Sequence, residues 1–239
     1  MALMLPVAAS ANETEFFRSW TRISPEKPQD LESGMCLLEI APYFQTGRGG
    51  SSDSAAIGLL FKADIGRNWE FRASSDGLSY GDRQYGIADL SLGIKWKALD
   101  GDFSLALALD VELPIGTKDF REPGVEPTLS LLMSRKFGRF EPSCSLSLTY
   151  VSAETGEHYY LSPQVSLGID YTADDYNSFG VFAAAYTPAS NSDHSLRAWI
   201  GGSYTRTLTE RHSVSATLMK GISCKGMDWS FGVTYDYTF

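Results

Sequence analysis

The chain has 239 residues, of which 43% are hydrophobic and 21% charged, a composition that argues against disorder of the whole chain. Its formal net charge of −9 disfavours nucleic acid as a partner. No run of about eighteen apolar residues occurs, so we predict no transmembrane helix. A transmembrane β-strand needs an apolar residue only at every second position, and the composition is therefore compatible with a membrane β-barrel.

Two segments precede the first predicted strand. Residues 1–11 are apolar and end in Ala-Ser-Ala, which is typical of a signal-peptide cleavage site. No basic residue precedes the apolar stretch, so we predict a shortened signal peptide. Residues 12–32 are polar and contain two prolines, and we predict that they form an irregular leader.

Residues 33–239 show one pattern throughout, in which apolar and polar residues alternate. Stretch 227–239 is the clearest, and 103–113 and 158–171 follow the same rule. The apolar set of the first of these is Met227, Trp229, Phe231, Val233, Tyr235, Tyr237 and Phe239. A period of two gives a strand with one dry face and one wet face. The sequence therefore predicts one all-β domain, an antiparallel up-and-down transmembrane β-barrel.

About twelve strands are predicted, with turn residues between them. Their approximate spans are 34–45, 54–65, 68–78, 86–98, 102–114, 125–136, 139–151, 158–171, 176–187, 194–206, 211–222 and 227–239. In 176–187 and 194–206 apolar and small residues occupy both sides, so the pattern leaves open which face of these two strands is dry.

The connections alternate in length. Tight turns such as 66–68 and 137–138 follow the even-numbered strands, and longer polar loops such as 46–53 and 115–124 follow most of the odd-numbered ones. Short periplasmic turns and long extracellular loops are typical of outer-membrane barrels. We therefore predict that the protein lies in the outer membrane of a Gram-negative bacterium, in contact with its lipid.

A soluble sandwich or a lipocalin-like barrel would show the same alternation with the apolar face turned inward. Strands of about twelve residues are longer than the five or six typical of soluble sheets. Aromatic residues gather toward the strand ends, as in interfacial girdles, and the polar face carries charges that suit a wet interior. The aromatic residues concerned are Trp69, Trp96, Phe103, Phe140, Tyr150, Tyr171, Tyr204, Trp229 and Tyr237. These features favour the membrane barrel.

The last strand ends on Phe239, with Val233, Tyr235 and Tyr237 behind it at alternate positions. This arrangement resembles the strand signature that the bacterial barrel-assembly machinery recognises. We therefore predict that machinery as a partner through the strand ending at Phe239.

Several stretches resemble the outer-membrane family named for the MetA pathway of phenol degradation. Residues 88–97, ADLSLGIKWK, are similar to its "gDlslglKyr" strand, and 113–116, LPIG, to its "lPtG". Residues 228–233, DWSFGV, are similar to its "dWfvgvG" strand, and 65–72 to its "gltdrlElr" hairpin. The resemblance covers roughly residues 55–239 and implies an outer-membrane channel or transporter for small solutes, including hydrophobic or aromatic ones.

Charged residues on the predicted inner face are the candidate functional residues. The acidic ones are Glu39, Asp64, Glu70, Asp89, Asp110, Glu112, Glu126, Glu141, Asp170, Asp228 and Asp236, and the basic ones are Lys62, Arg72, Lys95, Lys97 and Arg197. We predict that a pore is lined by Lys62, Arg72, Asp89, Lys95, Asp110, Glu112, Asp170, Arg197 and Asp228. The excess of acids predicts a negative potential that favours cations and neutral solutes, unless the charges form a salt-bridge network that fills the interior.

The sequence leaves open the place of the leader and allows two functions other than a channel. The leader could fold into the interior as a plug anchored by Phe16, Phe17 and Trp20, or could stay a periplasmic tail. The barrel could be a structural or ligand-binding protein without conductance. A barrel lipid hydrolase is disfavoured, because neither a Ser beside His158 or His194 nor a nucleophile elbow is evident.

No cofactor or metal is predicted. The cysteines Cys36, Cys144 and Cys224 have no metal-binding or redox spacing, and we predict that they are isolated small residues.

Overall fold

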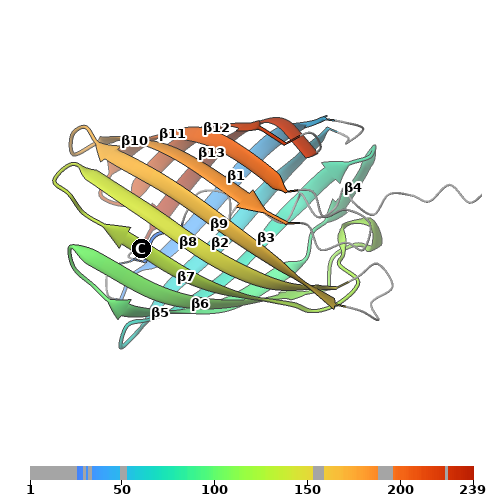
Figure 1. Ribbon diagram of the computed structural model, residues 1–239, viewed down its shortest axis with the longest axis horizontal. Coiled ribbons are helices and arrows are strands. Elements are labelled where there is room, and N and C mark those ends of the chain that lie inside the picture. Colours follow the sequence, from blue (N-terminus) through green and yellow to red (C-terminus); the bar gives the residue numbers. More distant parts are fainter. Residues whose placement is uncertain are drawn as a thin grey trace, which may run out of the picture.

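The computed structural model describes residues 26–28, 31, 34–48, 53–152, 159–187, 196–223 and 226–239. Its strands form a single antiparallel sheet in the order β2-β1-β13-β12-β11-β10-β9-β8-β7-β6-β5-β3-β4. Pairing of β2 with β3 closes this sheet into a barrel (Figure 1). The predicted up-and-down β-barrel is confirmed, with twelve strands in its wall and one extra short strand.

The strand bounds agree with the predicted spans to within a few residues. They are β1(Cys36–Arg48), β2(Ser54–Gly66), β3(Trp69–Gly81), β4(Gln84–Ile87), β5(Leu90–Leu99), β6(Phe103–Leu113), β7(Glu126–Arg135), β8(Phe140–Ser152), β9(Tyr159–Thr172), β10(Asn177–Tyr186), β11(Arg197–Thr209), β12(His212–Gly221) and β13(Gly226–Thr238). The described residues also include the 3-10 helix η2(Lys118–Phe120). No helix in this part of the chain is long and apolar enough to span a bilayer.

The prediction of one continuous strand over 86–98 is wrong, because the strand is interrupted at Ala88 and Asp89. β4 and β5 both pair with β3. Between them the Ala88 amide donates to the carbonyl of Gly77, and the register before and after the break is the same. Asp89 therefore lies outside both strands, and its carboxylate contacts a loop, as described below.

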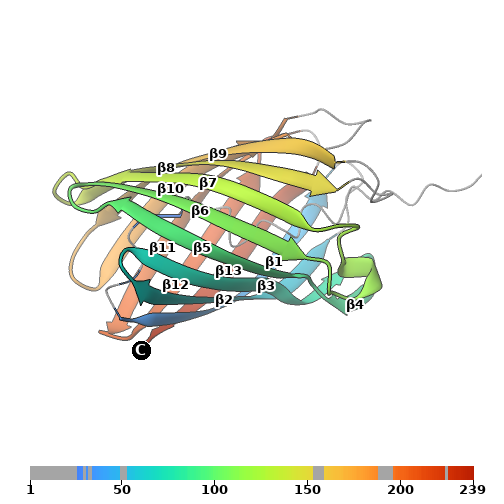
Figure 2. The same cartoon turned by 90° about the horizontal axis from the view of Figure 1, so that it is seen from below.

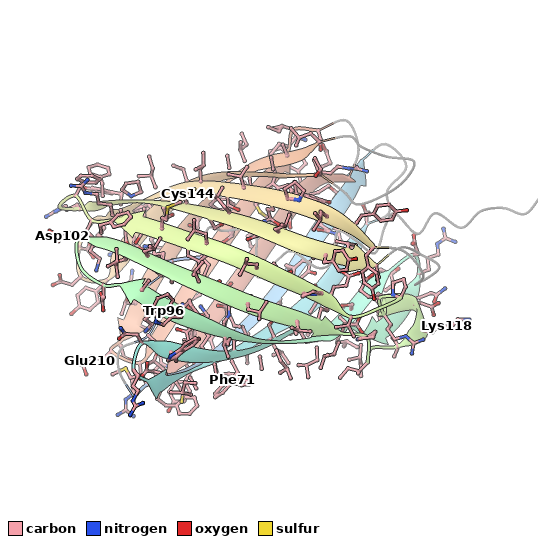
Figure 3. All side chains as sticks on the ribbon, turned by 60° about the horizontal axis from the view of Figure 1, so that its bottom comes forward. Phe71, Trp96, Asp102, Lys118, Cys144 and Glu210 are labelled. Carbon is pink, nitrogen blue, oxygen red and sulfur yellow. The ribbon has the colours of Figure 1, made fainter. Side chains whose placement is uncertain are left out.

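The two faces of the wall are apolar outside and polar inside. On β8 the exposed fraction of Leu146 is 44%, whereas its neighbour Ser145 is buried at 7%. On β13 Trp229 and Phe231 are exposed and Ser230 is buried between them. Figure 3 shows Trp96 and Phe71 on the outside of the wall. Apolar side chains exposed along the whole barrel are what a lipid environment requires, and they exclude a soluble barrel with an inward apolar core.

The two ends of the barrel differ in their connections. The turns after β2, β5, β7, β9 and β11 are tight and lie at one end, together with the end of β13, and the long β6–β7 connection lies at the other (Figures 1 and 2). The β2–β3 turn is a two-residue hairpin in which Arg67 and Asn68 both have positive φ, 53° and 68°. This turn type matches the right-handed twist of the flanking strands. The predicted separation of tight turns from long loops holds for most connections but not for β3 and β4, which a two-residue turn joins at the opposite end.

Aromatic side chains pair across neighbouring strands near the tight-turn end. The ring centroids of Trp69 and Trp96 are 6.3 Å apart, and those of Phe140 and Tyr171 are 5.0 Å apart. At the opposite end Tyr150 stacks on Tyr159 with centroids 4.6 Å apart. Such bands mark the levels at which a barrel meets the two membrane interfaces.

Candidate functional site

Charged side chains from four neighbouring strands meet inside the barrel. Glu70 on β3 and Lys95 on β5 are register partners, both fully buried, with Oε1 and Nζ 3.0 Å apart. Lys62 on β2 is the register partner of Arg72 on β3, which places two cations side by side. Arg72 Nε in turn lies 3.5 Å from Oδ1 of Asp110 on β6.

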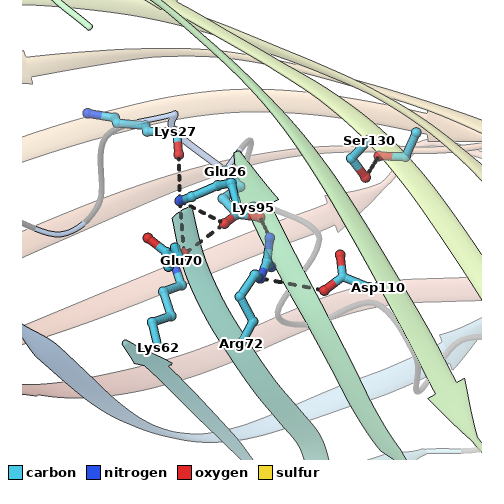
Figure 4. Close-up of polar contacts among 9 residues, drawn as sticks. Glu26, Lys27, Lys62, Glu70, Arg72, Lys95, Asp110 and Ser130 are labelled. Carbon is cyan, nitrogen blue, oxygen red and sulfur yellow. Dashed lines mark hydrogen bonds and ion pairs between the residues drawn. The ribbon is translucent and has the colours of Figure 1, made fainter. Parts of the chain in front are cut away.

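A leader residue joins this group. The Glu26 carboxylate lies 2.8 Å from Arg72 Nη1 through Oε2, and 3.5 Å from Lys95 Nζ and 3.6 Å from Lys62 Nζ through Oε1 (Figure 4). We call the six residues the charge cluster: Glu26, Lys62, Glu70, Arg72, Lys95 and Asp110. Its three cations come from three strands, so only the folded barrel brings them together.

Gly93 makes room for the charge cluster. It is the register partner of both Arg72 and Asp110, and it lies between them on β5. A Cβ built at Gly93 would overlap Oδ1 of Asp110 and would stand 2.9 Å from the carbonyl oxygen of Leu109. The missing side chain therefore allows the Asp110 carboxylate to reach across β5 toward Arg72.

We expect the substitution Gly93→Ala to lower the free energy of unfolding by about 1–3 kcal/mol, because overpacking forces neighbouring groups apart. The urea midpoint of the barrel in lipid vesicles measures this loss. Gly202→Ala on β11 is the matched control, since its Cβ would meet the carbonyl oxygen of Gly180 at an ordinary 3.5 Å. Equal midpoints for the two variants would contradict the packing argument.

The opposite side of the interior is acidic. Glu141 on β8 and Asp170 on β9 are register partners, and like charges at such positions repel each other. Lys27 relieves this repulsion, because its Nζ lies 2.7 Å from Glu141 Oε2 and 3.2 Å from Asp170 Oδ2. Burial lowers the pKa of Lys27, but the two carboxylates outweigh it and hold that pKa above its ordinary value. Lys27 is therefore a cation at neutral pH.

The described part of the leader thus crosses the barrel interior. Glu26 contacts one side and Lys27 the other, and Lys97 Nζ donates to the Leu31 carbonyl oxygen at 2.8 Å. We call Glu26–Pro28 and Leu31 the inner leader. Its position is the one expected of a plug, although the proposed anchors Phe16, Phe17 and Trp20 lie outside the described residues.

Basic and acidic side chains lie on different parts of the barrel interior, and composition alone does not reveal this separation. The basic residues Lys62, Arg72, Lys95 and Lys97 all lie on β2, β3 and β5, whereas β8 and β9 present Glu141 and Asp170. We call these the basic side and the acidic side. The simple excess of acids over bases therefore describes the total charge and not the field at any one point in the interior.

Asp89 has a different environment from the mid-strand residues with which it is grouped by sequence. It lies between β4 and β5, and its carboxylate accepts hydrogen bonds from the backbone N–H groups of Gly116 and Glu122, both at 2.7 Å. Those residues flank η2 in the long β6–β7 connection. Asp89 therefore helps to hold this loop against the barrel, together with the hydrogen bonds between Thr117 and Ile87.

The remaining predicted residues lie apart from the charge cluster. Arg197 is buried at the beginning of β11, and Glu112 near the end of β6 is half-buried opposite Glu126. Asp228 near the beginning of β13 pairs with Lys220, which also lies 4.5 Å from the centroid of the Trp229 ring. The structure therefore brings together Lys62, Arg72, Lys95 and Asp110, places Asp170 across the interior from them, and keeps the other predicted residues away from this group.

The sequence pattern does not single out Glu26 and Lys27, because they precede the barrel. Their signal is local: two adjacent residues of opposite charge stand between two prolines, in the sequence Pro-Glu-Lys-Pro. Proline restricts both its own backbone and that of the preceding residue. Such a segment is suited to presenting opposite charges in opposite directions.

Part of the interior is apolar, contrary to a uniformly wet inner face. Phe182 on β10, Trp199 on β11 and Met219 on β12 point inward and are buried. The buried residues of this apolar cluster are Ala41, Tyr43, Ala56, Phe182, Ala184, Trp199, Met219 and Met227. The structure thereby settles the two strands of ambiguous facing, 176–187 and 194–206, because their large inner residues pack together. The prediction that Met227 shares the outer face with Trp229 is wrong, because the register of β1 and β13 shifts next to these residues and Met227 is buried in this cluster.

The remaining candidates for chemistry show no catalytic arrangement in the described residues. His212 Nδ1 lies 2.6 Å from the Tyr235 hydroxyl, and its ring stacks on Tyr237. Cys36 and Cys144 are free thiols. His158, His194 and Cys224 lie outside the described residues, and within those residues no group of His, Cys, Asp and Glu side chains could hold a metal ion.

A closed barrel with an apolar outer surface, aromatic bands and a charged interior defines an outer-membrane β-barrel of Gram-negative bacteria. Residues 43–239 match the family described as "Putative MetA-pathway of phenol degradation", so the chain belongs to this family. The predicted resemblance is confirmed. None of the curated proteins matches the sequence.

Solved structures share the architecture at low sequence identity. The COG4313 outer membrane channel from Pseudomonas putida F1 is 12% identical with a TM-score of 0.72, covering 91% of this chain and 100% of that one. The NanC porin is 8% identical with a TM-score of 0.63, covering 84% and 98% of the two chains. The KdgM porin in complex with disordered oligogalacturonate is 11% identical with a TM-score of 0.57, covering 84% and 99%. At these identities the likeness concerns the fold.

Proposed function

We propose that the protein is a narrow outer-membrane channel that passes small solutes, including hydrophobic or aromatic ones. The observation that carries this proposal is the charged and hydroxyl-rich inner face of a closed barrel. Inward hydroxyls form cross-strand pairs, for example Thr128 with Thr149 and Ser130 with Ser147. Twelve strands lie between the eight whose side chains fill a barrel and the sixteen of wide porins, which favours a small pore.

Support for hydrophobic or aromatic solutes comes from two sources. The family description refers to phenol degradation, and the apolar cluster around Trp199 and Phe182 offers inward aromatic surface. A solute with an apolar body would be desolvated by such a surface and then would meet the polar part of the interior.

The competing proposal is a structural or ligand-binding barrel without conductance. It is favoured by one observation, the inner leader that joins the basic side to the acidic side. Liposome swelling with neutral solutes of graded size separates the two proposals. We expect the wild-type barrel to admit the smallest solutes and to exclude large ones. Absence of swelling in the wild type and in the double variant Glu26→Gln, Lys27→Gln would contradict the channel.

The pore-lining residues that we propose are charged groups of the barrel interior, namely Lys62, Arg72, Asp89, Lys95, Asp110, Glu112, Asp170, Arg197 and Asp228. The total inner charge is negative, so small ions are expected to pass with a preference for cations. Reversal potentials across a planar bilayer with a salt gradient measure this preference. Anion selectivity of the wild type would contradict it.

Assembly of the barrel is the remaining part of the proposal. We propose that the barrel-assembly machinery binds the end of β13, because Tyr235 and Tyr237 on this strand and Phe239 directly after it stand at alternate positions. Phe239→Ala is expected to lower the amount of folded barrel in the outer membrane several-fold. Heat-modifiable migration of the membrane fraction measures it. Phe231→Ala, on the same face of the same strand, is the control, and an equal loss would contradict recognition at the end of β13.

A further inference from the structure

The basic side of the barrel already holds a carboxylate. That carboxylate belongs to Glu26, which precedes the barrel in the sequence and contributes no strand to it. Lys62, Arg72 and Lys95, which hold it, are parts of the wall itself on β2, β3 and β5. The wall therefore carries a preformed binding site whose present occupant is a side chain of the leader.

Charge balance indicates what this site requires. Within the charge cluster the three cations face three carboxylates, those of Glu26, Glu70 and Asp110. Removal of Glu26 takes one carboxylate away from these three cations, of which Lys62 and Lys95 are almost completely buried. Loss of a carboxylate that contacts buried cations is costly, so the vacated site favours another anion.

The geometry selects the kind of anion. Each oxygen of the Glu26 carboxylate is used, Oε2 by Arg72 and Oε1 by Lys62 and Lys95. A planar group with two oxygens fits this arrangement, and Arg recognises such groups well. Glu70 and Asp110 lie close by and repel further negative charge. A monoanion therefore balances the site, whereas a phosphate dianion exceeds it.

We propose that Lys62, Arg72 and Lys95 bind the carboxylate of a small organic acid, which takes the place of the Glu26 side chain. The role of this site in solute passage rests on the proposed channel function. The net potential of the interior sets the preference for small cations over small anions. The basic side determines which solute binds. The solute class is thereby narrowed to monocarboxylates.

An apolar body on the acid is compatible with the rest of the interior. Ala56 of the apolar cluster and Lys62 lie on the same inner face of β2, six positions apart. At 3.3 Å per residue the two regions are roughly 20 Å apart along the strand. An aromatic acid would meet them in succession. Benzoate is therefore a suitable probe, and benzamide is its neutral counterpart of the same size.

The experiment measures binding to the full chain in detergent micelles by isothermal titration calorimetry. Glu26→Gln removes the competing charge and leaves every strand intact. We expect this variant to bind benzoate at least about tenfold more tightly than the wild type does, because a charge-assisted contact no longer competes. Benzamide should bind neither protein measurably. The change Lys27→Gln alters the same segment on the acidic side and should not raise the affinity for benzoate.

Equal benzoate affinities of wild type and Glu26→Gln would overturn the proposal, and so would equal affinities of the variant for benzoate and benzamide. Arg72→Gln in the Glu26→Gln background should abolish the gain, and a retained gain would place the site elsewhere. The readout requires no conduction. Failure of the carboxylate site and failure of the channel are therefore seen in different measurements.

Discussion

Replacing Lys95 by Met is expected to lower the free energy of unfolding of the barrel by about 3–5 kcal/mol, the loss typical of breaking a buried ion pair. Lys95 and Glu70 are both 0% exposed, and the substitution removes the cation 3.0 Å from a carboxylate that has no access to water. Methionine keeps most of the volume, so the loss reports charge and not a cavity. Urea unfolding in lipid vesicles, followed by tryptophan fluorescence, measures it.

Lys220→Met is the matched control. Lys220 also pairs with an acid, Asp228, but both side chains are about one-third exposed, at 32% and 30%. Exposed ion pairs contribute about 0–1 kcal/mol, so we expect a loss of about 1 kcal/mol or less. If the two lysine variants lost equal stability, burial of the Glu70–Lys95 pair would not explain its contribution.

Arginine in place of Leu146 is expected to destabilise the barrel by about 2–4 kcal/mol, the range for a cation on the lipid face near the bilayer midplane. Leu146 is the central residue of β8, and it is exposed on the outer surface between Leu131 and Val165. The urea midpoint in vesicles gives the loss.

The adjacent residue provides the comparison. Ser147 points inward and shares a hydrogen bond with Ser130, so Ser147→Arg loses one neutral hydrogen bond, about 0.5–1.5 kcal/mol. The two arginines stand one residue apart on the same strand and differ only in the face they occupy. Equal losses would contradict the assignment of the outer face to lipid.

Period-two alternation predicted most of the barrel wall, except the facing of residues 176–187 and 194–206, which the packing of Phe182 and Trp199 decides. A one-residue shift of register would turn every apolar residue of a strand inward, so the pattern fixes facing and strand bounds together. The pattern failed at Ala88 and Asp89, where alternation continues through a break in the strand. The Asp89 carboxylate there accepts hydrogen bonds from the backbone of a distant loop, and residues near it in the sequence carry no sign of that partner.

The site was harder to predict than the wall. The inward facing of Lys62, Arg72, Lys95 and Asp110 follows from the alternation. Their convergence depends on the strand order and on the register across β2, β3, β5 and β6. The alternation within one strand gives no information about either. The separation into a basic and an acidic side has the same origin. The place of Glu26 and Lys27 could not be derived, because the leader has no periodicity that would relate it to the barrel.

Glu26 is also covalently connected to the wall that holds it, since only a short segment separates it from Cys36 at the beginning of β1. A tether of this kind gives an intramolecular ligand an effective concentration of the order of millimolar, which no dilution of the surroundings can lower. A free acid outside the cell would have to outcompete this built-in rival. The tethered carboxylate therefore raises the concentration of external acid that is needed for half-maximal uptake. Shortening or lengthening the leader would shift this concentration without any change in the barrel.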